Sequence, residues 1–301
     1  MPISYDLDLY FEPAVSRSRI LQYFTTRKRY TVEENNAVYQ NPDTGVYFSM
    51  RLRCARSVLL QKNIVAAEFE INYHRPRFFG TEAEIELSAF VAAFQPRIHD
   101  PQMRGMGEGP YSGEGFLNGW NFGNLFSARL DLSDNPSRNI TSMPSVRLRA
   151  AWAWNYRLAE HQGRNPDCFV PTIKFFRIDQ PANTVIAWGD GMPVLLPKVD
   201  YVLVGRYISG EPRFGLAPWS EVAEIVERAG FGTTNDPLKL AYFTTPLPIA
   251  DWVAHIPMID IGALEQLRAD QIPDDELIAA AQESIKRDND DPSTMTIPSN
   301  S

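Results

Sequence analysis

The chain has 301 residues, of which 44% are hydrophobic, and this is enough for one large folded domain or two ordinary ones. Its formal net charge is −8, but the stretch from residue 270 onward holds eight acids against two bases and so contributes −6, leaving −2 for the rest. A nearly neutral body excludes the broad basic face that general nucleic-acid binding requires. No apolar stretch approaches the roughly 20 residues that cross a bilayer, so neither a nucleic-acid nor a membrane partner is predicted.

The chain opens with the pattern of a strand followed by a short helix. Apolar residues alternate with polar ones over residues 3–11, which predicts a half-buried strand. Ser16 is placed to cap a helix in which Ile20 and Phe24 turn inward. Basic residues gather locally before residue 80, at residues 27–29 and at Arg51 and Arg53 among others. Because Arg51 and Arg53 alternate, they fit the solvent-facing side of a strand better than a phosphate site.

A hairpin, a strand and a helix come next. Residues 38–50 predict a β-hairpin, because two apolar runs flank a Pro/Asp/Gly turn, and residues 64–73 predict another strand. Thr81 begins a capping-box pattern, which predicts a helix over residues 81–94 that turns Ile85 inward. With a short strand at residues 97–99, this region predicts an α+β lobe over residues 1–100.

Residues 101–143 form a separate segment that is rich in both glycine and aromatic residues. Five glycines lie between Arg104 and Phe116, and more follow around Trp120. Each glycine costs about 0.5–1 kcal/mol of chain entropy in a helix or strand, so the tract over residues 104–124 is predicted to be an ordered loop. Residues 116–132 also fit a helix despite their glycines.

Residues 144–287 predict a second α+β lobe. A long helix from Pro144 to His161 places Leu148, Trp152 and Tyr156 at four-residue spacing, which indicates a buried helix. Strand and helix patterns alternate after it: strands at 169–178, 185–188, 200–207 and 240–244, and helices at 220–229, 249–255 and from 274 onward. Residues 288–301 are acidic and polar, and we expect them to be disordered. The whole is predicted to be an α+β protein, with mixed or mostly antiparallel sheets packed against helices, in one large domain or two closely packed lobes.

Catalytic and metal-binding motifs are absent from the sequence. The four histidines lie far apart, so no metal site is predicted, and no cofactor motif occurs. The weak candidates for catalysis are His99 and Asp100, a neighbouring pair at the end of a strand that enters the glycine-rich tract. Cys54 and Cys168 are too few for a disulfide framework and indicate a reducing compartment, so a cytoplasmic protein is expected.

Recognition of a partner is the remaining chemistry that the sequence supports. Aromatic and polar side chains on the glycine-rich tract are of the types that anchor protein interfaces. The candidate binding residues are Arg104, Tyr111, Phe116, Trp120, Asn121, Phe122 and Asn124. The alternative for Trp120 and Phe122 is that their rings attach the tract to the core.

Four short motifs carry a resemblance to a known group of proteins. They are Tyr39-x-Asn41-x-x-Thr44-Gly45-Val46-Tyr47-Phe48, Asp100-Pro101-Gln102, Gly119-Trp120-Asn121-x-Gly123-Asn124 and Leu196-Pro197-x-Val199-Asp200. Through them, most of the chain up to about residue 285 resembles a family of uncharacterised bacterial proteins of similar length. The resemblance implies a bacterial cytosolic protein, in a class where accessory and toxin-neutralising proteins are frequent, and it implies no reaction.

These observations predict a non-enzymatic protein-binding factor, of the immunity or antitoxin kind, whose partner is a toxin or a subunit of a complex. An acidic chain suits a partner that acts on anionic substrates, because it mimics the charge of those substrates. The alternative is a small-molecule-binding protein or an enzyme of unrecognised class, in which the glycine-rich tract folds over a ligand.

Overall fold

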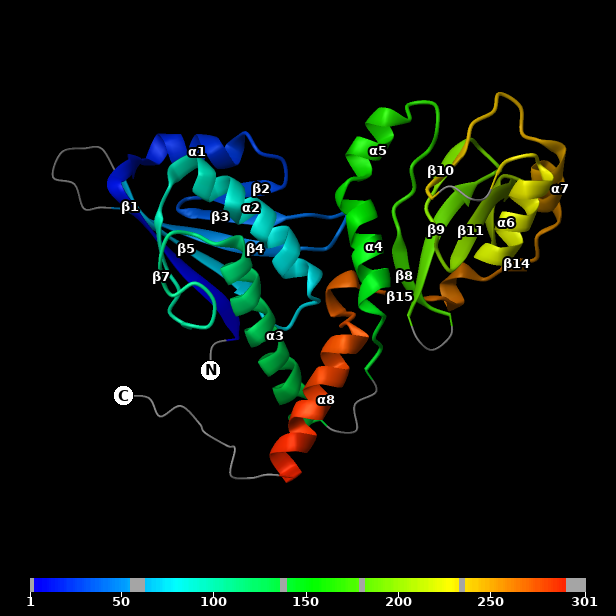
Figure 1. Ribbon diagram of the computed structural model, residues 1–301. Coiled ribbons are helices and arrows are strands. Elements are labelled where there is room, and N and C mark those ends of the chain that lie inside the picture. Colours follow the sequence, from blue (N-terminus) through cyan, green and yellow to red (C-terminus); the bar gives the residue numbers. More distant parts are fainter. Residues whose placement is uncertain (1–2, 55–62, 136–139, 179–181, 233–235, 291–301) are drawn as a thin grey trace. The chain divides into compact units, whose positions relative to one another are not determined.

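The computed structural model describes residues 3–54, 63–135, 140–178, 182–232 and 236–290. The chain divides into two compact units, one made of Met1–Pro144 and Pro273–Ser301 and the other of Ser145–Ile272. Both units combine helices with sheets, as Figure 1 shows, so the fold is of the predicted α+β class. The first unit includes the C-terminal helix, which the sequence had placed in the second lobe.

The first unit is built on a seven-stranded antiparallel sheet in the order β2-β3-β4-β5-β1-β6-β7. Its strands are β1 (Ser4–Ser16), β2 (Tyr30–Glu33), β3 (Asn36–Gln40), β4 (Tyr47–Cys54), β5 (Asn63–Asn72), β6 (Arg97–His99) and β7 (Glu108–Gly109). The predicted hairpin is confirmed, because Gln40 of β3 lies opposite Tyr47 of β4.

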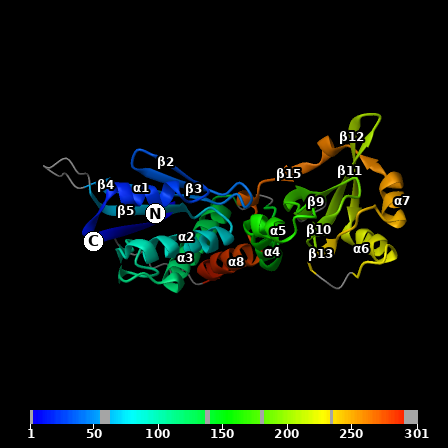
Figure 2. The same ribbon diagram turned by 90° about the horizontal axis from the view of Figure 1, so that it is seen from above.

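One face of this sheet is apolar and the other is polar, because side chains alternate along a strand. Tyr5, Leu7 and Leu9 of β1 are fully buried, as the alternation predicted. The helices α2 (Phe78–Phe94) and α3 (Gly113–Asp134) lie on one side of the sheet (Figure 2). The core of the unit therefore lies between the apolar face and these helices.

Local signals explain α1 (Arg17–Thr25) but not the start of α2. The Ser16 side chain accepts a hydrogen bond from the N–H of Arg19, so it is the predicted cap of α1. Helix α2 begins three residues before Thr81, and the N–H of Arg77 donates instead to the carboxylate of Asp274, 3.2 Å away. A partner nearly two hundred residues away thus replaces the predicted capping box, and Ile85 is exposed rather than buried.

Helix α3 confirms that residues 116–132 form a helix, and it extends the helix through much of the predicted loop. Ser112 caps it, because its hydroxyl accepts a hydrogen bond from the N–H of Gly115 at 3.0 Å. Helix α8 (Asp275–Asp290) lies beside α3 (Figure 1), and an ion pair joins Arg129 to Asp288. This packing assigns α8 to the first unit. Helix α8 continues to Asp290, and the rest of the predicted disordered tail lies outside the described residues.

The second unit holds a six-stranded mixed sheet in the order β14-β12-β11-β9-β8-β15 and a small antiparallel pair, β10-β13. Its strands are β8 (Lys174–Arg177), β9 (Asn183–Gly189), β10 (Val194–Leu196), β11 (Tyr201–Ile208), β12 (Glu211–Pro218), β13 (Leu238–Leu240), β14 (Met258–Ile259) and β15 (Glu265–Leu267). Strands β9 and β11 are parallel, and the other neighbours are antiparallel. The helices α6 (Trp219–Arg228) and α7 (Leu247–His255) belong to this unit, as do two short 3-10 turns, Ile261–Ala263 and Ala269–Gln271.

The single helix predicted from Pro144 to His161 is two helices, α4 (Ser145–Tyr156) and α5 (Leu158–Arg164). The break at Arg157 allows the ring of His161 to stack on that of Trp154, with centroids 4.4 Å apart. The buried side of α4 includes Asn155, which donates to the carbonyl of Ile173 and accepts from its N–H. None of the helices in the described part of the chain has the length and apolar character that crossing a membrane needs.

Candidate functional site

The glycine-rich loop between β6 and α3 is organised by one buried carboxylate. Asp100 is fully buried, and its Oδ2 accepts hydrogen bonds from the hydroxyl of Tyr5 at 3.0 Å and from the N–H of Met106 at 3.2 Å. Its Oδ1 accepts from the N–H of Gln102 at 3.0 Å, and its own N–H donates to the carbonyl of Gly107 at 2.8 Å. Bonds to a charged acceptor are strong, so this residue holds the loop in one conformation.

Tyr5 supports the same loop from the sheet. Burial, followed by the charge of Asp100, raises the pKa of the Tyr5 hydroxyl far above its usual value, so this hydroxyl remains a donor. Two glycines allow the loop and helix to approach it. A Cβ atom on Gly119 would lie 2.3 Å from the Tyr5 hydroxyl oxygen, and one on Gly105 would lie 2.9 Å from it. These glycines therefore serve close packing, a role that their number in the sequence could not reveal.

The structure separates the predicted binding residues into buried and exposed groups. Phe116 and Trp120 are fully buried, and their rings pack against Tyr5 and Tyr73 of the core at 5.4 and 5.7 Å between centroids. Asn124 is also buried, and its amide donates to the carbonyl of Tyr73 at 2.7 Å. For Trp120 the geometry thus matches the alternative in which its ring attaches the tract to the core, whereas Phe122, for which the same alternative was open, is exposed.

Tyr111 is half-buried and faces α2. Its hydroxyl lies 3.4 Å from the Glu84 carboxylate, to which it donates, and burial raises the pKa of this hydroxyl well above its usual value. Tyr111 thereby links the chain just before α3 to α2. Its ring is not part of the exposed surface formed by its neighbours along the tract.

The exposed members of the predicted set are Arg104, Asn121 and Phe122. Together with Met103, an exposed neighbour of Arg104 along the chain that the sequence did not single out, we call them the Arg104–Phe122 patch. The Arg104 guanidinium lies 4.8 Å from the centre of the Phe122 ring, a cation–π contact between the loop and α3. Phe122 is 44% exposed and Met103 is 66% exposed. The patch therefore presents an arginine and a methionine on a loop that the buried Asp100 fixes, beside an aromatic ring on α3.

The predicted pair of His99 and Asp100 is not brought together. Successive residues of a strand point to opposite faces, so Asp100 turns into the core while His99 lies on the polar face. The His99 Nδ1 atom is 3.4 Å from Glu108 Oε1 of the neighbouring strand. Because the carboxylate of Asp100 already accepts three hydrogen bonds, its geometry is that of a structural residue rather than of a base.

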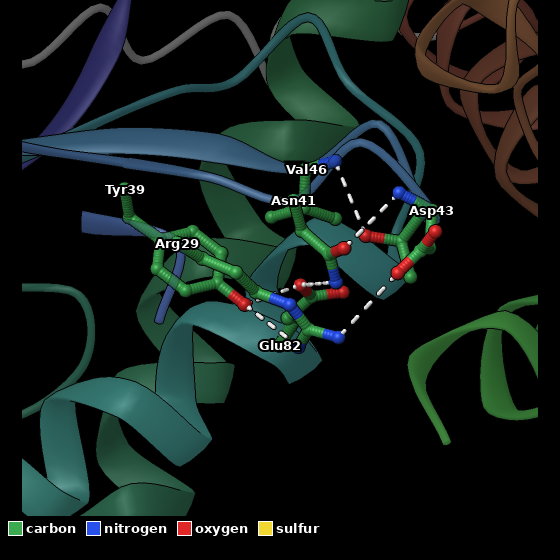
Figure 3. Close-up of polar contacts among 7 residues, drawn as sticks. Arg29, Tyr39, Asn41, Asp43, Val46 and Glu82 are labelled. Carbon is green, nitrogen blue, oxygen red and sulfur yellow. Dashed lines mark hydrogen bonds and ion pairs between the residues drawn. The ribbon is translucent and has the colours of Figure 1, made fainter. Parts of the chain in front are cut away.

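A second buried polar group, which we call the Glu82 cluster, attaches the β3–β4 hairpin to α2 (Figure 3). Glu82 is fully buried, and its Oε1 accepts hydrogen bonds from the hydroxyl of Tyr39 and from the amide of Asn41, both at 2.7 Å. Arg29 lies beside it, with Nη1 3.5 Å from the Tyr39 hydroxyl oxygen and Nη2 3.7 Å from Asp43 Oδ2. The cluster thus combines one buried acid with several donors.

The side chains of the turn complete the Glu82 cluster. Asn41 Oδ1 accepts from the N–H of Asp43, and Thr44 Oγ1 accepts from the N–H of Val46. Burial, followed by the charge of Glu82, raises the pKa of the Tyr39 hydroxyl far above its usual value. The Tyr39 hydroxyl therefore acts as a donor, and the cluster fixes the hairpin rather than supplying a proton.

The basic run at residues 27–29 is explained by the same helix. Arg27 forms an ion pair with Glu86 at 2.9 Å. Burial alone would lower the pKa of Arg29, but its neighbours raise it, and the charge of Glu82 is one of them. Arg27 and Arg29 lie in the turn between α1 and β2, where Arg29 has a φ of +77°, and from this turn they approach Glu86 and the Tyr39–Glu82 pair. These arginines are turned toward acids of their own chain, which argues further against a phosphate site.

Sequence reasoning missed Glu82 and Glu86 because it treated α2 as simply amphipathic. The available signal was a pair of acids four residues apart inside a strongly apolar helix, together with arginines at alternate positions upstream. Among the described residues, no group of three or more His, Cys, Asp or Glu side chains is placed to hold a metal ion.

A comparison of the chain with models of known protein families found no match, and comparisons with curated proteins and with solved structures found no significant one. The resemblance to uncharacterised bacterial proteins therefore stays an expectation.

Proposed function

We propose that this chain is a non-enzymatic protein-binding factor and that the Arg104–Phe122 patch contacts its partner. The observation that carries the proposal is the exposed Phe122 ring of α3, which lies under the guanidinium of Arg104 on a loop fixed by Asp100. Aromatic residues, arginine and methionine are the types enriched where protein interfaces gain most of their energy. A fixed loop loses little entropy on binding, which favours affinity.

The partner that fits the rest of the chain is a toxin, or a subunit of a complex, that acts on an anionic substrate. The net charge of −8 supports this class, because an acidic protein is attracted to a surface that binds anions. An immunity or antitoxin-like role in the cytoplasm is the corresponding proposal. Both cysteines are free thiols, and burial raises the pKa of the Cys168 thiol, which suits an unreactive cysteine in a reducing compartment.

The test is quantitative affinity purification from the native cell at low salt, with the wild type and three variants. Phe122→Ala and Arg104→Ala remove the two stacked side chains, and Leu130→Ala is the matched control, because Leu130 is also an exposed apolar residue of α3. If Phe122 is a hot spot, its variant loses about 2 kcal/mol of binding energy, which is roughly a thirtyfold loss of affinity.

A stoichiometric protein that is retained by the wild type and by Leu130→Ala, but lost by Phe122→Ala, supports the proposal and identifies the partner. Equal retention by all four proteins removes the patch from the interface. A small molecule that copurifies without any protein partner favours the alternative of a ligand-binding protein.

A further inference from the structure

The Arg104 side chain is an exposed cation that its own chain leaves without a counter-charge. Its guanidinium lies 4.8 Å from the centre of the Phe122 ring, and none of the described residues forms an ion pair or a hydrogen bond with it. Two other arginines of the same unit are paired, Arg97 with Glu108 at 3.3 Å and Arg129 with Asp288. Arg104 therefore differs from these two arginines in the partner that it lacks.

The acids that lie near Arg104 along the chain are held elsewhere. Asp100 is buried, and three donors already bind its carboxylate. Glu108 belongs to the neighbouring edge of the sheet, where it pairs with Arg97. Glu114 lies in the first turn of α3, a position in which the helix dipole favours a negative charge. The loop thus offers Arg104 a ring to contact but no carboxylate.

This arrangement has a consequence for any protein that covers the patch. Because the guanidinium of Arg104 lies over the Phe122 ring, a partner that covers the ring also removes water from the guanidinium. Removing water from an unpaired charge is costly, and an opposite charge placed against it offsets that cost. Guanidinium N–H groups form a fork that fits the two oxygens of a carboxylate. The best complement to Arg104 is therefore an acid that the partner supplies.

A second copy of the patch does not supply that acid. In a twofold contact the same surface meets itself, and the patch consists of Met103, Arg104, Asn121 and Phe122, none of which is acidic. Two Arg104 side chains would instead approach each other, and like charges across an interface are destabilising. The phosphates of a nucleic acid are disfavoured as well, because a chain with a net charge of −8 repels a polyanion.

We propose that the partner places an aspartate or glutamate side chain against Arg104 and an apolar side chain against Phe122. This inference rests on the proposed function and names the chemistry of the partner's side of the contact. An acid at this point is compatible with a partner that binds anions. One charge pair of reversed sign fixes the register between two surfaces that otherwise attract in the opposite sense.

The test turns the contact into a covalent bond in the full chain. Arg104→Lys keeps the positive charge and introduces an amine, which a water-soluble carbodiimide joins to a carboxylate that already touches it, forming an amide and a urea. The wild-type arginine does not react, so a new cross-link belongs to position 104. Arg157→Lys is the matched control, because Arg157 is an exposed arginine of the other unit. The tagged proteins are treated in extract of the native cell at low salt, and mass spectrometry identifies the linked peptides.

Arg104→Lys is expected to give a cross-linked partner peptide in which an aspartate or glutamate lies beside a large apolar residue. Arg157→Lys should not join the same peptide. Retention of the partner, titrated against the concentration of tagged protein, should weaken about tenfold in Arg104→Gln and about a hundredfold in Arg104→Glu. The second loss is larger because a like charge then faces the acid, whereas a purely apolar contact would respond equally to both changes.

Failure of this inference differs from failure of the proposed function. If the wild type retains no stoichiometric protein, both are overturned. If the wild type and Arg104→Lys retain the same partner but no cross-link to a partner carboxylate forms at position 104, only the acid is overturned. Equal losses in Arg104→Gln and Arg104→Glu, or a cross-link solely to an acid of this chain or of a second copy, overturn it in the same way.

Discussion

The replacement Asp100→Asn tests whether one carboxylate organises the loop that carries the Arg104–Phe122 patch. The wild-type side chain accepts three hydrogen bonds, from Tyr5, Gln102 and Met106, and Asn can accept at only one of its two terminal atoms. Whichever way the amide turns, a backbone N–H of the loop faces an NH₂ group. The loop therefore loses an acceptor at one of two buried positions.

The magnitude follows from the kind of bond that is lost. A buried donor left without an acceptor costs about 1–3 kcal/mol. Each surviving bond changes from a charged to a neutral acceptor, which costs about 1 kcal/mol. Relief from burying a charge offsets part of this sum, so the expected loss in the free energy of unfolding is about 2–4 kcal/mol.

Urea unfolding measures the loss, and hydrogen exchange of the Gln102 and Met106 amides locates it. Glu108→Gln is the control, because Glu108 is an exposed acid at the end of the same loop and should change stability by no more than about 0.5 kcal/mol. A loss below about 1 kcal/mol in Asp100→Asn, with unchanged protection of both amides, would refute the assignment of Asp100 as the organiser.

Three further predictions concern other parts of the fold. Trp120→Ala should lower the free energy of unfolding by about 3–5 kcal/mol in a urea titration, because the ring is fully buried. A variant that loses partner binding but keeps its stability would contradict this prediction. Glu82→Gln should lower it by about 2 kcal/mol, since two donors lose a charged acceptor, and a heteronuclear NMR spectrum should show the shifts confined to the β3–β4 hairpin and α2. Burial lowers the pKa of His161 below its usual 6.5, because the neutral ring is favoured in the folded protein. The stability that the neutral ring contributes is therefore complete above pH 6.5 and is lost as the pH falls below 6.5 toward the lowered pKa. Between about pH 7.5 and pH 5, the thermal unfolding temperature of His161→Gln should therefore fall less than that of the wild type.

Local patterns were sufficient for several elements of the first unit. Alternating apolar residues predicted β1, the Pro/Asp/Gly turn predicted the β3–β4 hairpin, and Ser16 predicted the start of α1. Each of these signals acts between residues close in sequence, so the chain alone determines it. The same is true of the α+β class, which follows from the strand-helix-strands-helix-strand order of residues 3–99.

Contacts between distant residues decided what the patterns could not. The start of α2 was misplaced because Asp274, far along the chain, takes the role that a local cap would have had. The break between α4 and α5 accompanies the stacking of His161 on Trp154, a ring contact that the helical pattern did not indicate. The grouping of α8 with the first unit likewise depends on its packing against α3.

The sequence by itself determined several elements and the fold class, and it suggested the segment in which to look for a site. It could not determine which side chains of that segment reach the surface. Composition records that glycines and aromatic residues are present, but burial depends on which neighbours the fold brings within contact distance. Tyr5 and Tyr73 fill the space beside α3, so Trp120 is enclosed and Phe122, two residues later, is exposed beside Arg104. Helical spacing turns those two positions to different sides of α3, and only the tertiary structure shows which side meets the sheet.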